Sequence, residues 1–447
     1  MATPALPPGP RGALIQAMRY TRNPLAFLEG MRRRYGDVFS VPYPTFGRPV
    51  YIADPDGIKA IYRGNPADFH AGEGNVGPLE PLMGSNSVFV LDDGEHMRER
   101  KLLLPRFHGE RIQRYAEVMA QAAAREVDRW PVGAPFAMLP RMQSVALEVI
   151  LRTVFGVTDP QRLALYHERV PQLGKIANLV VWVPAARRNL GRYSPWARFL
   201  RARGAMHELV LDEIERARRD PALEEREDIL ALLLQARHED GSPMTRDELR
   251  DELMTVIAAG HETTATGLSW MFERVLRHPQ VEERLRAELS AGEDSYMEAT
   301  VTEALRSRPV VTDTIRRVKR DVELSGWTLP AESFVIPSIA LMHLREDVYP
   351  EPHAFRPERF LDSKPSTYTW IPFGGGVRRC IGAPFAMLEM RTIGRTILER
   401  TRLRASDPRP ETPRARHVTI TPSRGAEVVL EERLAPRAEP LAAAARA

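Results

Sequence analysis

The chain has 447 residues, of which 43% are hydrophobic and 27% are charged, and its net charge is only +4. These values are typical of a globular protein with a large core. No apolar run reaches the roughly 18 residues that a bilayer span requires, and no basic stripe with interleaved aromatic residues indicates a nucleic-acid partner. The single cysteine, Cys380, excludes an internal disulfide.

The first ten residues are rich in proline and predict an extended lead-in. They have neither the basic nor the apolar segment of a signal peptide. With one cysteine and no export signal, we expect a cytoplasmic protein without a membrane anchor. No linker divides residues 11–431, which we expect to form a single domain, and residues 432–447 are expected to be a flexible tail.

Two helical stretches follow the lead-in, and short strands are then expected at 38–41 and 50–53. Residues 71–90 are rich in Gly, Pro, Asn and Ser, which predicts a long irregular loop. Such loops are often functional lids.

From Glu95 to about Gln280 the pattern is mostly helical. Residues 240–243 interrupt it, and Thr245 offers a cap for the next helix. Short strands are expected again around 321–337, with a turn at Ser325-Gly326, and near 417–421. The fold class is therefore mainly α with a small β-rich region.

The lone cysteine lies in the segment Phe-Gly-Gly-Gly-Val-Arg-Arg-Cys-Ile-Gly, residues 373–382. A thiolate ligand needs a loop that holds the sulfur in place and lets backbone N–H groups approach it, and glycines permit the unusual backbone angles that this requires. Hydrogen bonds to the sulfur then tune the bound metal. A free cysteine is more often a small buried hydrophobe, but the surrounding pattern favours a ligand.

A second motif, Ala-Gly-His-Glu-Thr-Thr at 259–264, lies inside a helix expected from about Glu248 to Arg274. The small residues 258–260 would let a large flat group lie against the helix. Thr263 can bond back to the carbonyl about one turn earlier and open the helix locally. Beside it, Glu262 completes an acid–alcohol pair able to deliver protons. Taken alone, the motif fits a packing or capping role equally well.

A third motif is Glu303-Ala-Leu-Arg306, which places an acid and a base on one helix face. A further arginine, Arg359, follows in Phe-Arg-Pro-Glu-Arg-Phe, residues 355–360. Such arginines pair with carboxylates through a planar fork.

Together, the three motifs in this order resemble the cytochrome P450 family over nearly the whole chain. The resemblance implies that the fold encloses haem b and that the Cys380 thiolate is the proximal ligand of the haem iron. It implies that Glu262 and Thr263 organise water and deliver protons on the oxygen-binding side. It also implies that Glu303, Arg306 and Arg359 form a buried structural network.

Haem propionates need cations, and three arginines match the family's positions for them. Arg378 lies two residues before the cysteine, and Arg316 lies ten residues beyond the EALR motif. Arg100 shares a helix face with His96. The resemblance implies that all four side chains bind the cofactor, although each arginine could also be an ordinary surface residue.

The implied activity is that of a bacterial-type monooxygenase that inserts one oxygen atom from O2 into a lipophilic molecule such as a terpenoid, steroid or fatty acid. The pocket would be lined by 71–90, by 173–188, and by residues in three further segments: Met254, Ile257, Ala258, Val310, Val311, Thr312 and 418–420.

The chain has no flavin or nicotinamide motif, so electrons from NAD(P)H are expected to arrive through a ferredoxin and a ferredoxin reductase. A basic face with Arg98, Lys101, Arg106 and Arg379 could steer the ferredoxin. We expect the chain to act as a monomer.

Two alternatives remain open at this level. One is a peroxide-driven peroxygenase or a haem-thiolate isomerase, relatives that usually lack the acid–alcohol pair. The other is a non-enzymatic haem-thiolate binding or sensor protein, which would not need Glu262, Thr263 or a large distal pocket.

Overall fold

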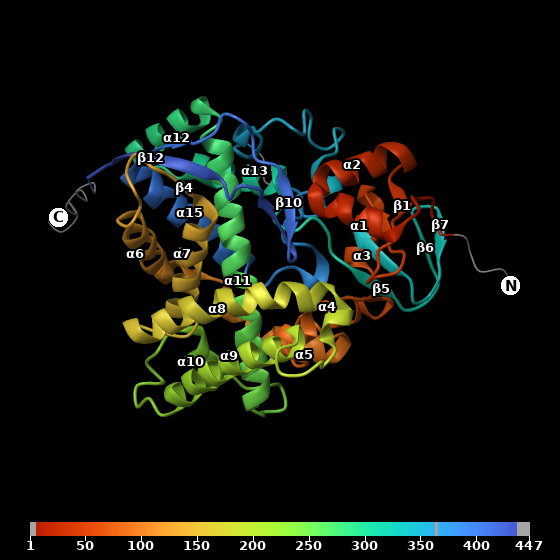
Figure 1. Ribbon diagram of the computed structural model, residues 1–447, viewed down its shortest axis with the longest axis horizontal. Helices are drawn as coiled ribbons and strands as arrows, with labels where there is room; N and C mark the ends of the chain where they lie inside the picture. Colours follow the sequence, from red (N-terminus) through yellow and green to blue (C-terminus); the bar gives the residue numbers. More distant parts are fainter. Residues whose placement is uncertain (1–5, 363–364, 436–447) are drawn as a thin grey trace.

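The computed structural model describes residues 6–362 and 365–435 (Figure 1). The helices of this part are α1 (Ala13–Arg22), α2 (Pro24–Tyr35), α3 (Pro55–Arg63), α4 (Gly72–Met83), α5 (Asp93–Leu103), α6 (Ala116–Val127), α7 (Met138–Thr153), α8 (Pro160–Trp182), α9 (Pro195–Arg218), α10 (Ile229–Gln235), α11 (Arg246–Val275), α12 (Pro279–Ala291), α13 (Ser295–Ser307), α14 (Ile339–His343) and α15 (Ala383–Arg400). The mainly helical class predicted from the sequence is confirmed.

The strands of the described part form four small sheets, of which the two largest lie beside the helical body and the β10–β11 hairpin packs on α11 (Figure 1). The largest has the order β1-β2-β8-β5-β3, in which only β2 and β8 run parallel, and a three-stranded sheet has the order β4-β12-β9. The hairpins β6–β7 and β10–β11 each form a separate two-stranded sheet. Their bounds are β1 (Val38–Ser40), β2 (Val50–Ile52), β3 (Phe69–His70), β4 (Pro135–Ala137), β5 (Arg316–Val318), β6 (Val322–Leu324), β7 (Trp327–Leu329), β8 (Phe334–Pro337), β9 (Thr401–Ala405), β10 (Pro413–Arg416), β11 (Thr419–Pro422) and β12 (Glu427–Arg433).

Helix α11 crosses the middle of the molecule (Figure 1) and packs against α7, α13 and α15. Its start has the cap that the sequence predicts. Thr245 Oγ1 accepts the backbone N–H of Glu248, and the Glu248 carboxylate accepts the N–H of Thr245. This reciprocal capping box satisfies donors that the first helical turn leaves unpaired.

The β6–β7 hairpin turns at Ser325-Gly326, as predicted, and both residues have positive φ, 50° and 80°. Two consecutive turn residues with positive φ give the turn a twist that matches that of the flanking strands, and glycine adopts a positive φ without strain. The sheet of β4, β9 and β12 was not predicted, because its strands come from distant parts of the chain.

The prediction of an irregular loop at 71–90 is wrong for its first half, which forms α4. The helix contains Pro78 and Pro81 and has no cap of its own. Its first N–H groups, at Gly72 and Glu73, donate instead to the carboxylate of Asp92, at 2.9 Å each. This cap lies twenty residues further along the chain, so the local pattern did not indicate it.

At the start of the described chain, hydrogen bonds fix the lead-in against the first sheet. Ser40 donates through its N–H to Pro8 O and through its hydroxyl to Pro7 O, which ties the lead-in to β1. Strand β12 runs to Arg433, two residues into the predicted tail, and 436–447 lie outside the described residues. Within the described part, no helix combines the length and apolar character that a membrane crossing requires.

Candidate functional site

The cysteine loop, residues 373–382 before α15, is held by its own backbone and by Tyr62 of α3. The N–H of Cys380 donates to Phe373 O at 2.9 Å. Gly374 and Gly376 have positive φ, 68° and 64°, and a Cβ on Gly375 would lie 2.4 Å from the Tyr62 ring. The glycines are therefore required for the backbone path and for the close approach to α3, as the sequence indicated.

Cys380 itself lies three residues before the first residue of α15. Burial raises the pKa of its thiol, while the backbone N–H groups of Gly382 and Ala383 and the charges of Arg379 and Arg100 lower it. The side chain is nonetheless solvent-accessible. The sulfur is surrounded by protein atoms and is still accessible, so it faces an internal space. The backbone N–H groups of Gly382 and Ala383 beside it stabilise the thiolate form.

The four residues predicted to bind propionates converge near this loop. Burial, followed by the charges of Arg378, Arg100 and Arg316, lowers the pKa of His96 to about 3. Burial also lowers the pKa of Arg378 to about 10, and Arg316 and Arg100 act in the same direction. Asp92 is the acid that pairs with Arg378. Arg100, Arg316 and Arg378 face the two carboxylates of Asp92 and Asp93, and the remaining positive charge suits an anionic ligand.

These arginines are positioned by backbone carbonyl groups as well as by charge. Arg100 donates to Arg379 O at 2.8 Å, and Arg378 donates to Val88 O and Leu91 O. Arg316 opens β5, and its guanidinium lies 5.9 Å from the Tyr62 ring centroid.

The middle of α11 borders the same kind of internal space. Residues 251–255 and 264–275 are buried, whereas 258–263 are partly exposed although the helix is central. Thr263 Oγ1 donates to Ala259 O at 2.6 Å, as predicted. A Cβ on Gly260 would lie 2.8 Å from the Ile150 side chain of α7, so this glycine also allows close packing of the two helices. All three small residues, 258–260, are partly exposed.

Glu262 has a partner that the sequence did not indicate. His417, at positive φ in the β10–β11 turn, places Nδ1 2.9 Å from Glu262 Oε1. Although burial raises the pKa of Glu262, the hydrogen bond and charge of His417, with His261 and Arg416, bring it below its usual value. The two side chains are 16% and 19% exposed, so the pair lies between the interior and the surface.

A second acid near α11 was also missed. Glu389 of α15 is buried, and burial raises its pKa to about 8, although a hydrogen bond with Thr264 lowers it. An acid nine residues after the cysteine has no local feature that marks it as functional.

The network predicted for Glu303, Arg306 and Arg359 is confirmed. Glu303 and Arg306 are fully buried in α13 and share two hydrogen bonds of 2.6 and 2.7 Å. Arg359 Nε lies 3.6 Å from the same carboxylate. Arg306 also donates to the carbonyls of His343, Pro352 and Ala354, so the network holds the segment before the cysteine loop.

Several segments predicted to line a substrate pocket lie together beside α11. Ile420 N donates to Val310 O, and Trp270 Nε1 of α11 donates to Ile420 O, both at 2.7 Å. Thr312, however, hydrogen-bonds to Tyr20 at 2.6 Å and is buried, so we assign it to packing of α1.

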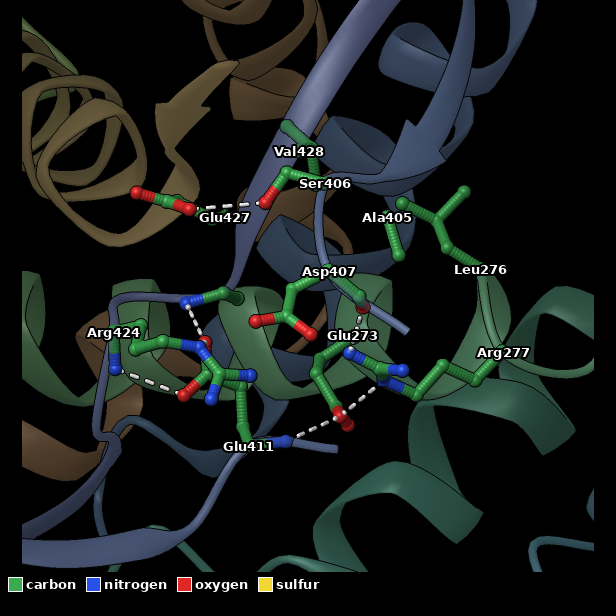
Figure 2. Close-up of a pocket in the computed structure, with 11 residues that line it drawn as sticks. Glu273, Leu276, Arg277, Ala405, Ser406, Asp407, Glu411, Arg424, Glu427 and Val428 are labelled. Atoms are coloured by element: carbon green, nitrogen blue, oxygen red, sulfur yellow. Dashed lines mark hydrogen bonds and ion pairs between the residues drawn. The ribbon is translucent and has the colours of Figure 1, made fainter. Parts of the chain in front are cut away.

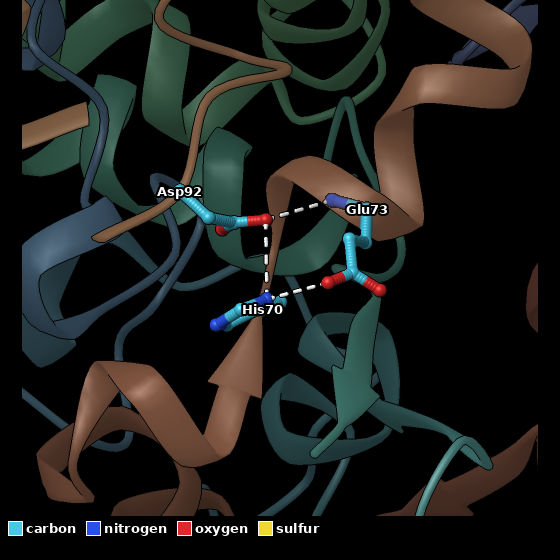
Figure 3. A group of neighbouring side chains, drawn as sticks. All are labelled: His70, Glu73 and Asp92. Atoms are coloured by element: carbon cyan, nitrogen blue, oxygen red, sulfur yellow. Dashed lines mark hydrogen bonds and ion pairs between the residues drawn. The ribbon is translucent and has the colours of Figure 1, made fainter. Parts of the chain in front are cut away.

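Two other polar clusters consist of charged side chains that already have a partner of opposite charge. In Figure 2, Glu273 accepts hydrogen bonds from Arg277 and from the N–H of Glu411, while Glu411 accepts the N–H of Arg424. In Figure 3, His70, Glu73 and Asp92 meet where β3 enters α4. Lys319 neutralises Glu73 and Arg378 neutralises Asp92. We regard both clusters as structural.

The donor set as a whole fits haem. A sulfur at a helix N-terminus can ligate iron, the surplus of arginine suits two propionates, and the accessible stretch of α11 offers small residues and an acid–alcohol pair.

The comparisons with known proteins agree with this chemistry. The sequence model of the cytochrome P450 family matches residues 4–429. A Mycobacterium tuberculosis protein described as cytochrome P450 135B1 is 43% identical over 433 residues, 95% of this chain and 91% of that protein. Another from the same species, described as cytochrome P450 138, is 38% identical over 432 residues, 96% and 97% of the two chains.

Among solved structures, a cyanobacterial CYP120A1 with bound retinoic acid superposes with a TM-score of 0.84 at 22% identity, covering 97% of this chain and all of that one. This similarity concerns the fold. The match over nearly the full length, with the cysteine loop in place, shows that the chain belongs to the cytochrome P450 family of haem-thiolate monooxygenases.

Proposed function

We propose that this cytochrome P450 inserts one oxygen atom from O2 into a lipophilic small molecule such as a terpenoid, steroid or fatty acid, in the cytoplasm. The observation that carries the proposal is the partly exposed stretch 258–263 within the buried helix α11. Glu262 and Thr263 lie in this stretch, and the buried apolar residues Val310 and Ile420 pack beside the same helix, where Trp270 donates to Ile420 O.

The roles follow from the chemistry of each side chain. Haem, when bound, supplies the activation of dioxygen, and the protein supplies position and electrostatics. Cys380 would hold the iron, and His96, Arg100, Arg316 and Arg378 would bind the propionates. The apolar lining would orient the substrate and exclude water.

Glu262 and Thr263 would move protons into this space. Thr263 has a hydroxyl that donates to Ala259 O and can accept a bond from water. Glu262 is held by His417, which is itself partly exposed. An acid that contacts a surface histidine can exchange protons with solvent, whereas the alcohol orders water within the site.

The test measures the ratio of product formed to NAD(P)H consumed, after a library of lipophilic compounds has been screened for spin-state shifts in the visible spectrum. Thr263→Ala should still bind haem and substrate but divert electrons to hydrogen peroxide, with a loss of product of about 10²–10⁴-fold. An unchanged ratio and rate in Thr263→Ala and Glu262→Gln would contradict the proton-delivery role and favour a peroxygenase.

Electrons from NAD(P)H would arrive through a ferredoxin reductase and a ferredoxin that docks near Arg379, on the side of the cysteine loop. The basic face is partly neutralised, because Lys101 pairs with Glu239 at 2.6 Å and Arg98 lies 3.7 Å from Asp240. Lys101 is still 55% exposed. It can therefore contribute to long-range steering of an acidic partner.

Lys101→Glu should slow the second-order rate of reduction by ferredoxin at low salt, with less effect at high salt, because exposed charges are screened. Lys175→Glu, an exposed lysine on α8, makes the same charge change and is the control. Equal rates of reduction for the two variants at low salt would show that Lys101 is not part of the docking face.

A further inference from the structure

A histidine and two glutamates meet away from the site described above. Glu99 lies on α5, His238 in the segment between α10 and α11, and Glu248 in the first turn of α11. Their potential ligand atoms all lie within 4.8 Å of one another, and His238 Nε2 is 3.9 Å from Glu99 Oε1. Three separate elements therefore bring an N,O,O donor set to one point.

Two members of this cluster are buried with hydrogen-bonding capacity left over. The side chains of His238 and Glu99 are only 1% and 4% exposed. Within the described residues, neither ring nitrogen of His238 has a hydrogen-bond partner, and neither has Glu99 Oε2. Leaving such atoms unpaired costs about 1–3 kcal/mol each, so buried polar groups without a partner point to a missing one.

The surrounding charges favour a cation as that partner. Burial, and then the charge of Glu248, raises the pKa of Glu99 to about 7, although Arg98 lowers it. Burial, with Glu99, Asp251 and Glu248, also raises the pKa of Glu252, one turn beyond Glu248 on α11. Arg98 offsets Glu99 only in part because it also lies near Asp240, and Arg250 is paired with Asp251.

We propose that Glu99, His238 and Glu248 form a binding site for a divalent transition-metal cation, with Zn²⁺ as the ion that suits the donor set best. Zinc takes histidine nitrogen and carboxylate oxygen at about 2.0–2.2 Å in a tetrahedron, in which two ligand atoms lie about 3.3–3.6 Å apart. The 3.9 Å separation of His238 and Glu99 requires only a small contraction.

Glu248 has a geometry that suits the role of a ligand. One oxygen of Glu248 accepts the N–H of Thr245, which leaves the other oxygen for the metal. Glu248 is also partly exposed, which gives the ion a route from solvent. The two carboxylates would neutralise a divalent charge, so the buried cluster would carry no net charge of its own.

Bound there, the ion would join α5 to the segment before α11. The pairs Lys101–Glu239 and Arg98–Asp240 already connect these elements on the surface. The metal would lie beneath them and hold α5, which carries Arg100, in a fixed position.

The experiment uses the haem-loaded full-length protein, stripped with a chelator and titrated with Zn²⁺ alone. The wild type should bind one zinc per chain and melt at a higher temperature with zinc than with chelator. His238→Ala and Glu99→Gln should each weaken binding by more than about 100-fold, because even outer partners of a metal ligand are worth about 10–100-fold. His353→Ala, a 67% exposed histidine paired with Glu29, is the control and should bind as the wild type does.

Zinc K-edge X-ray absorption identifies the site directly. The expected spectrum has only nitrogen and oxygen neighbours at about 2.0–2.2 Å. Sulfur neighbours would assign the zinc to Cys380 instead and overturn the proposal. So would a wild type that binds no zinc at micromolar concentration, or one that binds no better than His238→Ala.

Glu248→Gln keeps the experiment decisive if Glu99→Gln does not fold. Gln at this position preserves the capping box but replaces one carboxylate. It should fold and bind zinc much more weakly, and wild-type affinity in this variant would contradict the proposal.

Discussion

Replacing Glu303 with Gln tests whether the fold around the cysteine loop depends on a buried ion pair. Both Glu303 and Arg306 are fully buried, and the carboxylate accepts two bonds from the guanidinium and one from Arg356 N at 2.9 Å. Glutamine keeps the shape of the side chain. It removes the charge, however, and turns one acceptor into an NH2 group that faces the donors of Arg306.

The expected cost follows from what is left behind. Arg306 would keep its bonds to carbonyl groups but lose its compensating charge in a fully buried position. Breaking one side of a buried pair costs about 3–5 kcal/mol, against a total stability of about 5–15 kcal/mol for a typical protein. Glu303→Gln should therefore lose a large part of its free energy of unfolding.

Glu298→Gln on the same helix is the matched control. Glu298 is 58% exposed and pairs with Arg391 at 2.6 Å. Exposed pairs contribute about 0–1 kcal/mol, so this variant should unfold close to the wild type.

The assay is urea unfolding of the haem-loaded proteins, followed by far-UV circular dichroism and by the Soret band, with refolding checked by dilution. Glu303→Gln should shift the midpoint strongly to lower urea, and Glu298→Gln should not. Equal midpoints for the two variants would refute the claim that burial makes this network strong.

Three further predictions concern the site. Cys380→Ala should abolish the red-shifted carbon monoxide band of a thiolate-ligated haem, and a retained band would contradict ligation. His417→Gln removes a hydrogen bond and a charge that lower the pKa of Glu262. The low-pH limb of the pH profile of coupled turnover should therefore move to higher pH. An unmoved limb would show that His417 does not control the protonation of Glu262. Burial raises the pKa of Glu389 to about 8, so it keeps its proton when folded, whereas it ionises near pH 4.5 in the unfolded chain, and its contribution to stability therefore falls as pH rises between these values. Glu389→Gln should remove this fall, at most about 1.4 kcal/mol per pH unit, in unfolding measured from pH 5 to 8, and parallel curves would contradict it.

The features that the sequence by itself determined are local ones. The cysteine loop depends on neighbouring glycines, whose positive φ and lack of a Cβ are required within a few residues of the sulfur. The capping box of α11 uses Thr245 and Glu248, three residues apart. The Glu303–Arg306 pair lies within one helical turn. In each case the partners are close in sequence, so residue type and spacing were sufficient.

Other features were decided only by the tertiary structure, because their partners are far apart in the chain. Helix α4 forms in a Gly- and Pro-rich segment since Asp92 caps it from outside. Glu262 finds His417 across 155 residues, and Glu99 meets His238 across a segment of comparable length. No local sequence pattern predicts these contacts between distant residues. They depend on how the helices pack around α11, which fixes the charges and the burial that each acid experiences.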